Sequence, residues 1–261
     1  MNQANMTQAN MTQANQKVEL QKVAIVTGSS RGIGAAVAQR LARDGFAVVV
    51  NYAGNAAAAQ EVVQHVVQAG GNAIAVKADV SDAAAVRALF DAAQEAFGRI
   101  DVLVNNAGIL ANATIADNDD ASFDRHIAIN LKGSFNGMRE AAKRLHDGGR
   151  IINLSTSLVG TLLPTYGVYT ATKAAVEVLT SVLSKEMRGR NITVNAVAPG
   201  PTATELFLDG KTQEYVDHFA KIVPLERLGQ PEDIAAAVSF LAGADGGWIN
   251  GQTLRANGGL V

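Results

Sequence analysis

Two residues near the middle of the chain, Tyr169 and Lys173, have types and a spacing suited to acid–base chemistry. They stand four positions apart near the start of a predicted helix, so their side chains share one face. A lysine ammonium beside a phenol favours the phenolate and lowers the tyrosine pKa from about 10. Such a tyrosine donates a proton to a carbonyl oxygen while hydride reaches the carbon. A pair of this kind also occurs by chance on surface helices. Tyr166 has no such partner, because position 170 is Thr.

Three consecutive hydroxyl side chains, Ser155, Thr156 and Ser157, end a predicted strand. If the extended geometry persists, Ser155 and Ser157 point to one side and Thr156 to the other. A hydroxyl at this position could hydrogen-bond a substrate oxygen. The alternative is ordinary capping of a strand end, and the three residues by themselves favour it.

A glycine-rich stretch, Thr27-Gly28-Ser29-Ser30-Arg31-Gly32-Ile33-Gly34, follows the first predicted strand. Its glycines allow a tight turn and a close approach of backbone to a ligand. The helix that begins there presents unpaired N–H groups and the positive end of its dipole, which suits a pyrophosphate. The spacing differs from the G-x-G-x-x-G fingerprint. No Gly-Lys-Ser/Thr follows, so a nucleoside-triphosphate loop is excluded. A glycine turn without a ligand is the alternative, and its position between strand and helix disfavours it.

The end of the second predicted strand indicates which dinucleotide is bound. An acidic residue there would hydrogen-bond the 2′-hydroxyl of NAD. The chain has Val50-Asn51-Tyr52-Ala53-Gly54-Asn55 instead, without a carboxylate to repel a 2′-phosphate. Arg31 could form a charge-assisted pair with that phosphate. The sequence therefore predicts NADP(H), with a merely solvated Arg31 as the alternative.

Apolar strand-like runs alternate with Ala-rich helical stretches from Lys22 onward. The predicted strands are Val23–Thr27, Ala47–Asn51, Ala73–Lys77, Val102–Asn105, Arg150–Ser155, Thr193–Ala198 and Thr253–Ala256. Helices are predicted near 33–44, 55–69, 82–97, 120–145, 169–188 and 231–243. Continuous apolar strands suit a sheet covered on both faces, and the alternation predicts parallel pairing through right-handed crossovers. The expected fold is α/β, a doubly wound, mostly parallel sheet in three α/β/α layers, with ligands at the carboxyl ends of the strands.

The rest of the chain divides simply. Residues 1–16 form a polar five-residue repeat, which predicts a disordered tail without an assigned function. Residues 17–261 contain no linker and predict one dinucleotide-binding catalytic domain. Residues 201–228 carry no strand pattern, include several apolar and aromatic side chains, and could form a lid over a substrate.

Composition excludes several classes of protein. The net charge is -2 and the sequence pI about 6.1, without a basic block, so a nucleic-acid partner is not expected. The absence of Cys excludes disulfides and thiolate metal sites, and the four His residues lack ligand spacing, so no metal is expected. Neither a membrane span nor a signal peptide is visible. A cytoplasmic location is the default expectation.

Taken together, these motifs identify the chain as similar to the short-chain dehydrogenase/reductase family, of the single-domain NADP-preferring type with a Rossmann-type sheet. The resemblance covers nearly all of residues 22–261. It is carried, in order, by Thr27-Gly28-x-x-x-Gly32-x-Gly34, Asp79-Val80, Asn105-Asn106-Ala107-Gly108, Asn130, Ser157, Tyr169-x-x-x-Lys173, and Pro199-Gly200 with Thr204.

The resemblance implies a role for each matching residue. Tyr169 would be the acid/base, Lys173 would hold the nicotinamide ribose and tune Tyr169, and Ser157 would orient the substrate carbonyl. Asn130 would anchor a water linked to Lys173. The cofactor-binding residues would be Gly28, Ser30, Arg31, Gly32, Ile33, Gly34, Asn51, Tyr52, Ala53, Asp79, Val80, Asn106, Ala107, Gly108, Tyr169, Lys173, Pro199, Gly200, Thr202 and Thr204.

The chain departs from the family pattern at two places. Ser157 lies twelve residues before Tyr169, whereas thirteen is commoner in relatives. Ser157 is preferred to Ser155 because Ser157-Leu158-Val159-Gly160 matches the family's Ser-x-x-Gly turn, with a one-residue deletion in 161–168. Near the end, Ala256-Asn257-Gly258-Gly259 replaces a common Val-Asp-Gly-Gly.

The substrate is less well defined than the reaction. The residues Leu158, Leu162, Leu163, Tyr166, Leu206 and Phe207 predict an apolar pocket, although they could equally be ordinary core. A general carbonyl, ketone or polyol-type reductase is preferred. The alternative is a 3-oxoacyl-carrier-protein reductase, with Arg190 beside the cleft, and a remote one is a non-catalytic NADP-binding sensor. An epimerase or dehydratase would need a longer C-terminal region. Family resemblance also implies a homo-oligomer, typically a tetramer.

Overall fold

The computed structural model describes residues 21–261, and the predicted tail lies outside this range. Seven strands form one parallel sheet in the order β3-β2-β1-β4-β5-β6-β7. They are β1 (Val23–Val26), β2 (Ala47–Tyr52), β3 (Ala73–Lys77), β4 (Val102–Asn105), β5 (Arg150–Leu154), β6 (Thr193–Pro199) and β7 (Thr253–Ala256). The doubly wound α/β fold is confirmed, and each strand boundary lies within one residue of its predicted position.

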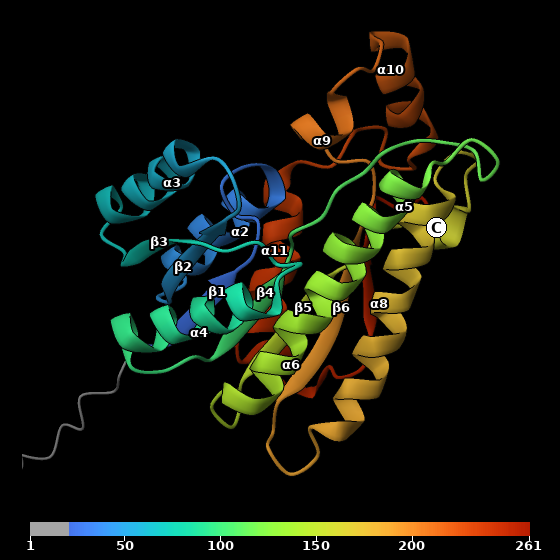
Figure 1. The fold of residues 1–261 in the computed structure, drawn as a ribbon. Coiled ribbons are helices and arrows are strands. Elements are labelled where there is room, and N and C mark those ends of the chain that lie inside the picture. The colour runs from blue at the N-terminus through green and yellow to red at the C-terminus, as the bar shows by residue number, and fades with distance from the viewer. Residues whose placement is uncertain (1–20) are drawn as a thin grey trace, which may run out of the picture.

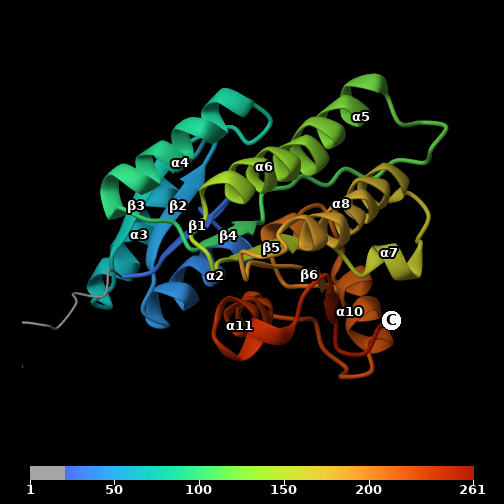
Figure 2. The same ribbon diagram turned by 90° about the horizontal axis from the view of Figure 1, so that it is seen from below.

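Helices cover both faces of the sheet, as Figure 2 shows. One face carries α2 (Gly32–Arg43), α3 (Ala56–Gln68) and α11 (Pro231–Ala242), and the other carries α4 (Ala83–Phe97), α6 (Ser134–Arg144) and α8 (Gly167–Glu186). The strands supply both layers because side chains alternate. Ala24 and Val26 belong to the first core and Val23 and Ile25 to the second, all fully buried.

The helix predicted over 120–145 is divided in the structure. Residues Asp120–His126 form α5, Ile127–Gly133 form a π-helix (η1), and α6 follows directly. The wider turn occurs at Asn130, whose carbonyl accepts a hydrogen bond from the Ser134 hydroxyl at 2.7 Å. Single π segments inside helices are frequent at functional sites.

Short elements complete the chain. They are α7 (Leu158–Thr161), α9 (Glu205–Leu208), α10 (Gln213–Ile222) and a 3-10 turn, η2 (Asp245–Trp248). Figure 1 shows α9 and α10 above one end of the sheet, where the lid was predicted. Within residues 21–261, no helix combines the length and apolar character needed to cross a bilayer. The single domain over 17–261 stays a prediction.

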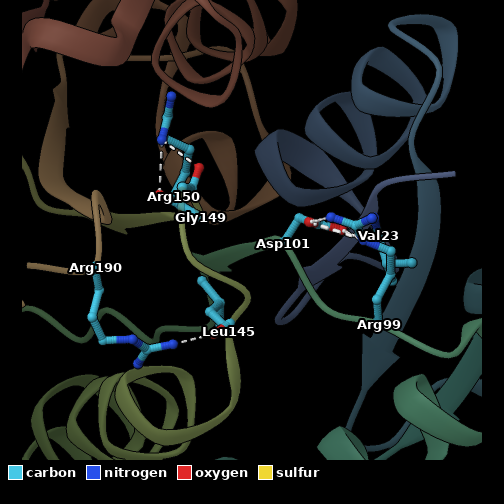
Figure 3. Close-up of polar contacts among 8 residues, drawn as sticks. Val23, Arg99, Asp101, Leu145, Gly149, Arg150 and Arg190 are labelled. Carbon is cyan, nitrogen blue, oxygen red and sulfur yellow. Dashed lines mark hydrogen bonds and ion pairs between the residues drawn. The ribbon is translucent and has the colours of Figure 1, made fainter. Parts of the chain in front are cut away.

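Polar contacts join the strands at the opposite, amino-terminal edge of the sheet (Figure 3). Asp101, just before β4, accepts a hydrogen bond from Val23 N at the start of β1 at 2.8 Å. Arg99 Nε donates to the same carboxylate at 2.9 Å. Arg150, which begins β5, donates to the Gly149 carbonyl at 2.9 Å. These bonds hold the amino-terminal ends of the central strands in place. The loops of the site follow the opposite, carboxyl ends of the strands.

Candidate active site

Tyr169 and Lys173 lie together in the first two turns of α8, as their spacing predicted. Lys173 is buried, and its ammonium donates to the carbonyl of Leu154 at the end of β5 at 2.7 Å. The same ammonium lies 5.8 Å from the centre of the Tyr169 ring. Helix α8 thus carries both groups, and β5 fixes the position of the lysine.

Burial changes the acidity of both groups. Desolvation raises the pKa of Tyr169 to about 12, against a smaller lowering by a hydrogen bond from the Thr156 side chain. Desolvation lowers the pKa of Lys173 to about 8. The expectation that the lysine lowers the tyrosine pKa below its usual value is wrong for this structure. The desolvation of the phenol outweighs the favourable contacts of its phenolate.

The three hydroxyls after β5 have different partners. Ser155 donates to Glu177 on α8 at 2.5 Å, and Ser157 donates to the Ala198 carbonyl on β6 at 3.2 Å. Thr156 Oγ1 accepts from Leu158 N at 3.3 Å, and the Thr156 side chain is the one that favours the Tyr169 phenolate and lowers its pKa. All three line the same cleft as Tyr169.

Asn130 is fully buried and holds the loop that follows β4. Its Oδ1 accepts from Ile109 N at 2.8 Å, and its Nδ2 donates to the Ile109 carbonyl at 3.0 Å. A Cβ added to neighbouring Gly108 would lie 3.3 Å from Asn130 Oδ1 and 3.4 Å from Lys173 Nζ. The predicted residues Gly108, Asn130 and Lys173 therefore converge.

The glycine-rich loop lies beside the loop after β4. Gly28 has a φ of +60°, and a Cβ there would lie 2.8 Å from Ala107 Cα. Gly34 is equally confined, because a Cβ would lie 2.5 Å from Asn106 Nδ2. Asn106 Nδ2 in turn donates to the Gly28 carbonyl at 3.0 Å. These two glycines are therefore needed for the close packing of the two loops.

Helix α2 has the properties of an anion-binding helix end. Its N-cap residue, Arg31, makes no side-chain capping bond, and its first turn carries no acidic residue. The N-terminal N–H groups of a twelve-residue helix are therefore suited to the pyrophosphate of a dinucleotide. The residues at this position fit the predicted cofactor.

The other predicted cofactor residues surround the same edge of the sheet. Asn51 accepts from Gly28 N at 3.1 Å and donates to the Ala78 carbonyl at 3.0 Å, so it joins two loops. Asp79 accepts from Ser81 N at 2.9 Å, and Val80 is buried. The remaining members of the predicted set lie at the carboxyl ends of their strands or directly after them. Ser30 is in the glycine-rich loop, and Gly32 and Ile33 begin α2. Tyr52 and Pro199 are the last residues of β2 and β6, and Ala53, Gly200, Thr202 and Thr204 follow those strands.

A cleft of about 950 Å³, including its open mouth, extends from Tyr169 and Lys173 toward the lid. Its apolar lining includes Leu110, Leu158, Leu163, Leu206, Phe207, Phe219 and Leu260. Phe219 belongs to the segment predicted to form the lid, whereas Leu110 and Leu260 were missed, because no local pattern shows that these distant segments meet. Leu162 was expected to line the cleft, but it is 72% exposed and lines an outer groove instead.

Known proteins are similar to this chain in both sequence and fold. A family model described as enoyl-(acyl carrier protein) reductase matches residues 28–261. A short-chain type dehydrogenase/reductase from Picea abies is 48% identical over 250 residues, covering 92% of each chain. The chain belongs to the short-chain dehydrogenase/reductase family.

Two further relatives give the comparison more detail. An NADPH-dependent aldehyde reductase-like protein, described as chloroplastic, from Arabidopsis thaliana is 46% identical and covers 92% of this chain and 94% of its own. The crystal structure of a short-chain dehydrogenase from Burkholderia cenocepacia in complex with NADP has a TM-score of 0.88. It is 38% identical and covers 92% of this chain and 98% of its own.

In this short-chain dehydrogenase/reductase, the lid is joined to the cleft by a pair of tyrosines. Tyr166 OH and Tyr215 OH on α10 are 2.9 Å apart. The Tyr215 ring packs against Phe219 with centroids 4.8 Å apart, and Phe219 is buried. Tyr166, which the sequence excluded as the acid/base, therefore lines the cleft and contacts the lid through Tyr215.

A buried histidine of the enzyme was missed at the sequence level. His126 donates from Nδ1 to the Ser122 carbonyl at 2.8 Å and accepts at Nε2 from Ala111 N at 3.2 Å. These two partners match a neutral ring with its proton on Nδ1. His126 thereby holds the loop that contains Leu110 against the helix of Asn130.

Arg190 does not lie beside the cleft, contrary to the expectation for a carrier-protein reductase. It precedes β6 at the amino-terminal edge of the sheet, where it pairs with Asp147 at 2.8 Å. It also donates to the Leu145 carbonyl (Figure 3). A side chain held at this edge cannot contact a carrier that delivers substrate to the opposite edge.

Proposed function

We propose that this enzyme reduces an aldehyde or ketone with apolar substituents, using NADPH and Tyr169 as the general acid. The observation that carries the proposal is the pair of buried Lys173 and half-buried Tyr169 at the base of an apolar cleft, beside a helix N-terminus suited to a pyrophosphate. The Arabidopsis relative described as an NADPH-dependent aldehyde reductase supports the same reaction.

Each part of the site has a separate role in the proposed reduction. NADPH, when bound, supplies the hydride. Tyr169 donates its phenolic proton to the carbonyl oxygen, and a pKa of about 12 keeps that proton in place at neutral pH. The Lys173 ammonium, charged below about pH 8, stabilises the phenolate that remains. The apolar walls and the lid exclude water from the reacting carbon.

The experiment that tests the function follows NADPH consumption with a panel of aliphatic and aromatic aldehydes, ketones and carboxylated analogues. We expect turnover with apolar carbonyls and weak turnover with carboxylates, because the cleft lining named above carries no cation besides Lys173. Failure of the wild-type enzyme to oxidise NADPH with any of these carbonyls would rule the proposal out.

Cofactor choice depends on Arg31, which sits in the glycine-rich loop. In the structure Arg31 pairs with Glu205 of the lid at 2.8 Å, and both side chains are largely exposed. An exposed ion pair is weak, so Arg31 is free to exchange Glu205 for a 2′-phosphate. The end of β2 offers no carboxylate to oppose that phosphate. NADP(H) is therefore the cofactor we assign.

Replacing Arg31 by Ala is expected to weaken NADPH binding about tenfold and to change NADH binding less than about threefold, because only NADPH carries the phosphate. Fluorescence titration with both cofactors measures this. Arg40→Ala is the matched control, since Arg40 pairs with Asp44 on the same helix at 3.0 Å. Equal losses for NADPH and NADH in the Arg31 variant would contradict this account of cofactor choice.

Oligomerisation stays a prediction, and the outer face of α8 supports it. Val178 is 63% exposed and Val182 47% exposed on this helix, and Phe135 is exposed on neighbouring α6. Apolar side chains gathered on one face are typical of an interface. We expect a homotetramer or dimer by light scattering, and Val178→Lys combined with Val182→Lys should lower the measured mass. A monomeric wild-type protein would refute the expectation.

A further inference from the structure

The post-β7 segment (residues 257–261) forms one wall of the cleft. Its Leu260 is half-buried and lines the cleft together with Tyr169 and the lid residue Phe219. An apolar side chain in this position contacts the substituents of a carbonyl held beside Tyr169. The volume of that side chain can therefore limit which carbonyls enter.

The post-β7 segment joins the lid to α7. On the lid side, a Cβ added to Gly259 would lie 3.2 Å from Pro224 Cγ. On the other side, a Cβ added to Gly160 of α7 would lie 2.6 Å from Val261 Cγ2, so the valine packs directly against that helix. Leu260 stands between these two contacts. It closes the cleft where the lid and α7 would otherwise leave an opening.

Hydrogen bonds of Asn257 hold this wall in place. The Asn257 side chain is buried, and its Nδ2 donates to Ser157 Oγ at 3.0 Å and to Val261 O at 3.1 Å. Its Oδ1 accepts from Gly259 N at 3.0 Å, and its backbone carbonyl accepts from Leu260 N at 3.3 Å. The backbone is thus fixed on both sides of Leu260, and the wall cannot retreat from a larger substrate.

The lid side of the cleft is held less firmly. Leu206 and Phe207 lie on α9, whose first residue, Glu205, pairs with Arg31 through two largely exposed side chains. An exposed ion pair contributes little to stability, so this side can move to admit a substrate. The fixed wall, where Leu260 lies, is therefore the one that sets a size limit.

We propose that Leu260 limits the size of the carbonyl substrate and that Asn257 is the positioning residue that holds Leu260 in the wall. The inference rests on the proposed function and deepens it by naming a specificity-determining residue. Specificity is a difference between the free energies of two substrates at one site, so a ratio of kcat/KM values reports it directly.

The test compares kcat/KM for naphthaldehyde and benzaldehyde, two apolar aldehydes that differ by one fused ring. Leu260→Ala opens space in the wall, and we expect the naphthaldehyde-to-benzaldehyde ratio to rise about tenfold over the wild-type value. Leu260→Phe fills the same space and should lower the ratio about tenfold. NADPH affinity, measured by fluorescence titration, should stay within about threefold of the wild-type value in both variants, because the start of α2 is untouched.

Two further variants test the positioning role and the choice of leucine. Asn257→Ala removes the side-chain bonds to Ser157, Val261 and Gly259, and it should raise the ratio by at least about threefold. A loss of kcat common to both aldehydes cancels in the ratio, so a merely structural role would not move it. Leu162→Ala is the matched control, since Leu162 is 72% exposed and lies outside the cleft. It should leave the ratio within about twofold.

The outcomes separate this inference from the proposed function. If the wild-type enzyme is active and both Leu260 variants keep its ratio within about twofold, Leu260 does not limit substrate size. A shift of the same sign in Leu260→Ala and Leu260→Phe also contradicts the inference. An unchanged ratio in Asn257→Ala refutes the positioning role alone. A wild-type enzyme that consumes no NADPH with any carbonyl overturns the proposed function, and the size limit with it. Opposite shifts in the two Leu260 variants confirm the inference.

Discussion

Replacing Tyr169 by Phe is expected to lower kcat for NADPH-dependent carbonyl reduction by about 1,000-fold, because the variant keeps the ring and loses the proton donor. The Lys173 ammonium lies 5.8 Å from the centre of the Tyr169 ring, and the substitution adds no atoms to this space. The cradle at the start of α2 is untouched, so NADPH affinity should change less than about threefold. Steady-state NADPH oxidation and fluorescence titration measure the two quantities.

The high pKa of Tyr169 means that the phenol acts as a proton donor in the reduction. A phenol with a pKa of about 12 remains protonated through neutral pH and acts as an acid, which is the form that reduction requires. Tyr166→Phe is the matched control, since Tyr166 lies three residues earlier and bonds Tyr215 instead. It should lower kcat less than about tenfold. Full turnover by Tyr169→Phe would mean that another group donates the proton.

Replacing Lys173 by Met is expected to have opposite effects on activity and stability. Activity should fall about 100-fold, because the phenolate of Tyr169 loses its neighbouring positive charge. Stability at pH 7 should rise by about 2 kcal/mol, because methionine fills the buried space without a charge to desolvate. A lysine pKa lowered to about 8 by burial corresponds to a cost of roughly 3 kcal/mol. The Leu154 carbonyl loses the hydrogen bond from Lys173, which offsets about 1 kcal/mol of the gain.

The stability difference should depend on pH in one direction. Below about pH 8 the lysine is charged in both the folded and unfolded states, and the full cost of burying the charge is present. Between about pH 8 and its usual pKa of about 10.4, the folded state has released the proton and the unfolded state has not, so the wild-type protein gains stability as the pH rises. The advantage of Lys173→Met should therefore shrink over this interval. Urea unfolding of both proteins across the range measures it. An advantage that grows with pH would show that the buried charge is not its cause.

The sequence determined the architecture because the signals for it are local. Uninterrupted apolar runs such as Ala47–Val50 can only be buried on both faces, which requires a parallel sheet with helices on each side. The i, i+4 spacing of Tyr169 and Lys173 placed both on one face of a helix, and the glycines at 28 and 34 marked the turn at the start of α2. Regular backbone geometry converts these patterns directly into positions.

The tertiary structure decided what depends on partners distant in sequence. Three adjacent hydroxyls looked alike, and their separation came from Glu177 on α8, Ala198 on β6 and Asn257 after β7. A hydroxyl has no fixed direction until a neighbour accepts its proton, so the choice of Ser157 from the sequence rested on the match of Ser157-Leu158-Val159-Gly160 to the family's Ser-x-x-Gly turn.

The pKa of Tyr169, the partner of Arg31 and the lining of the cleft also depend on contacts between residues distant in sequence. The pKa of Tyr169 was expected to fall because its lysine neighbour was visible, whereas burial, which raises it, depends on the whole fold. Arg31 meets Glu205, 174 residues later, and Leu260 closes a cleft that begins at Ile33. Spacing along the chain determined which groups share an element, and only packing between elements determined which of their protons and charges are free to act.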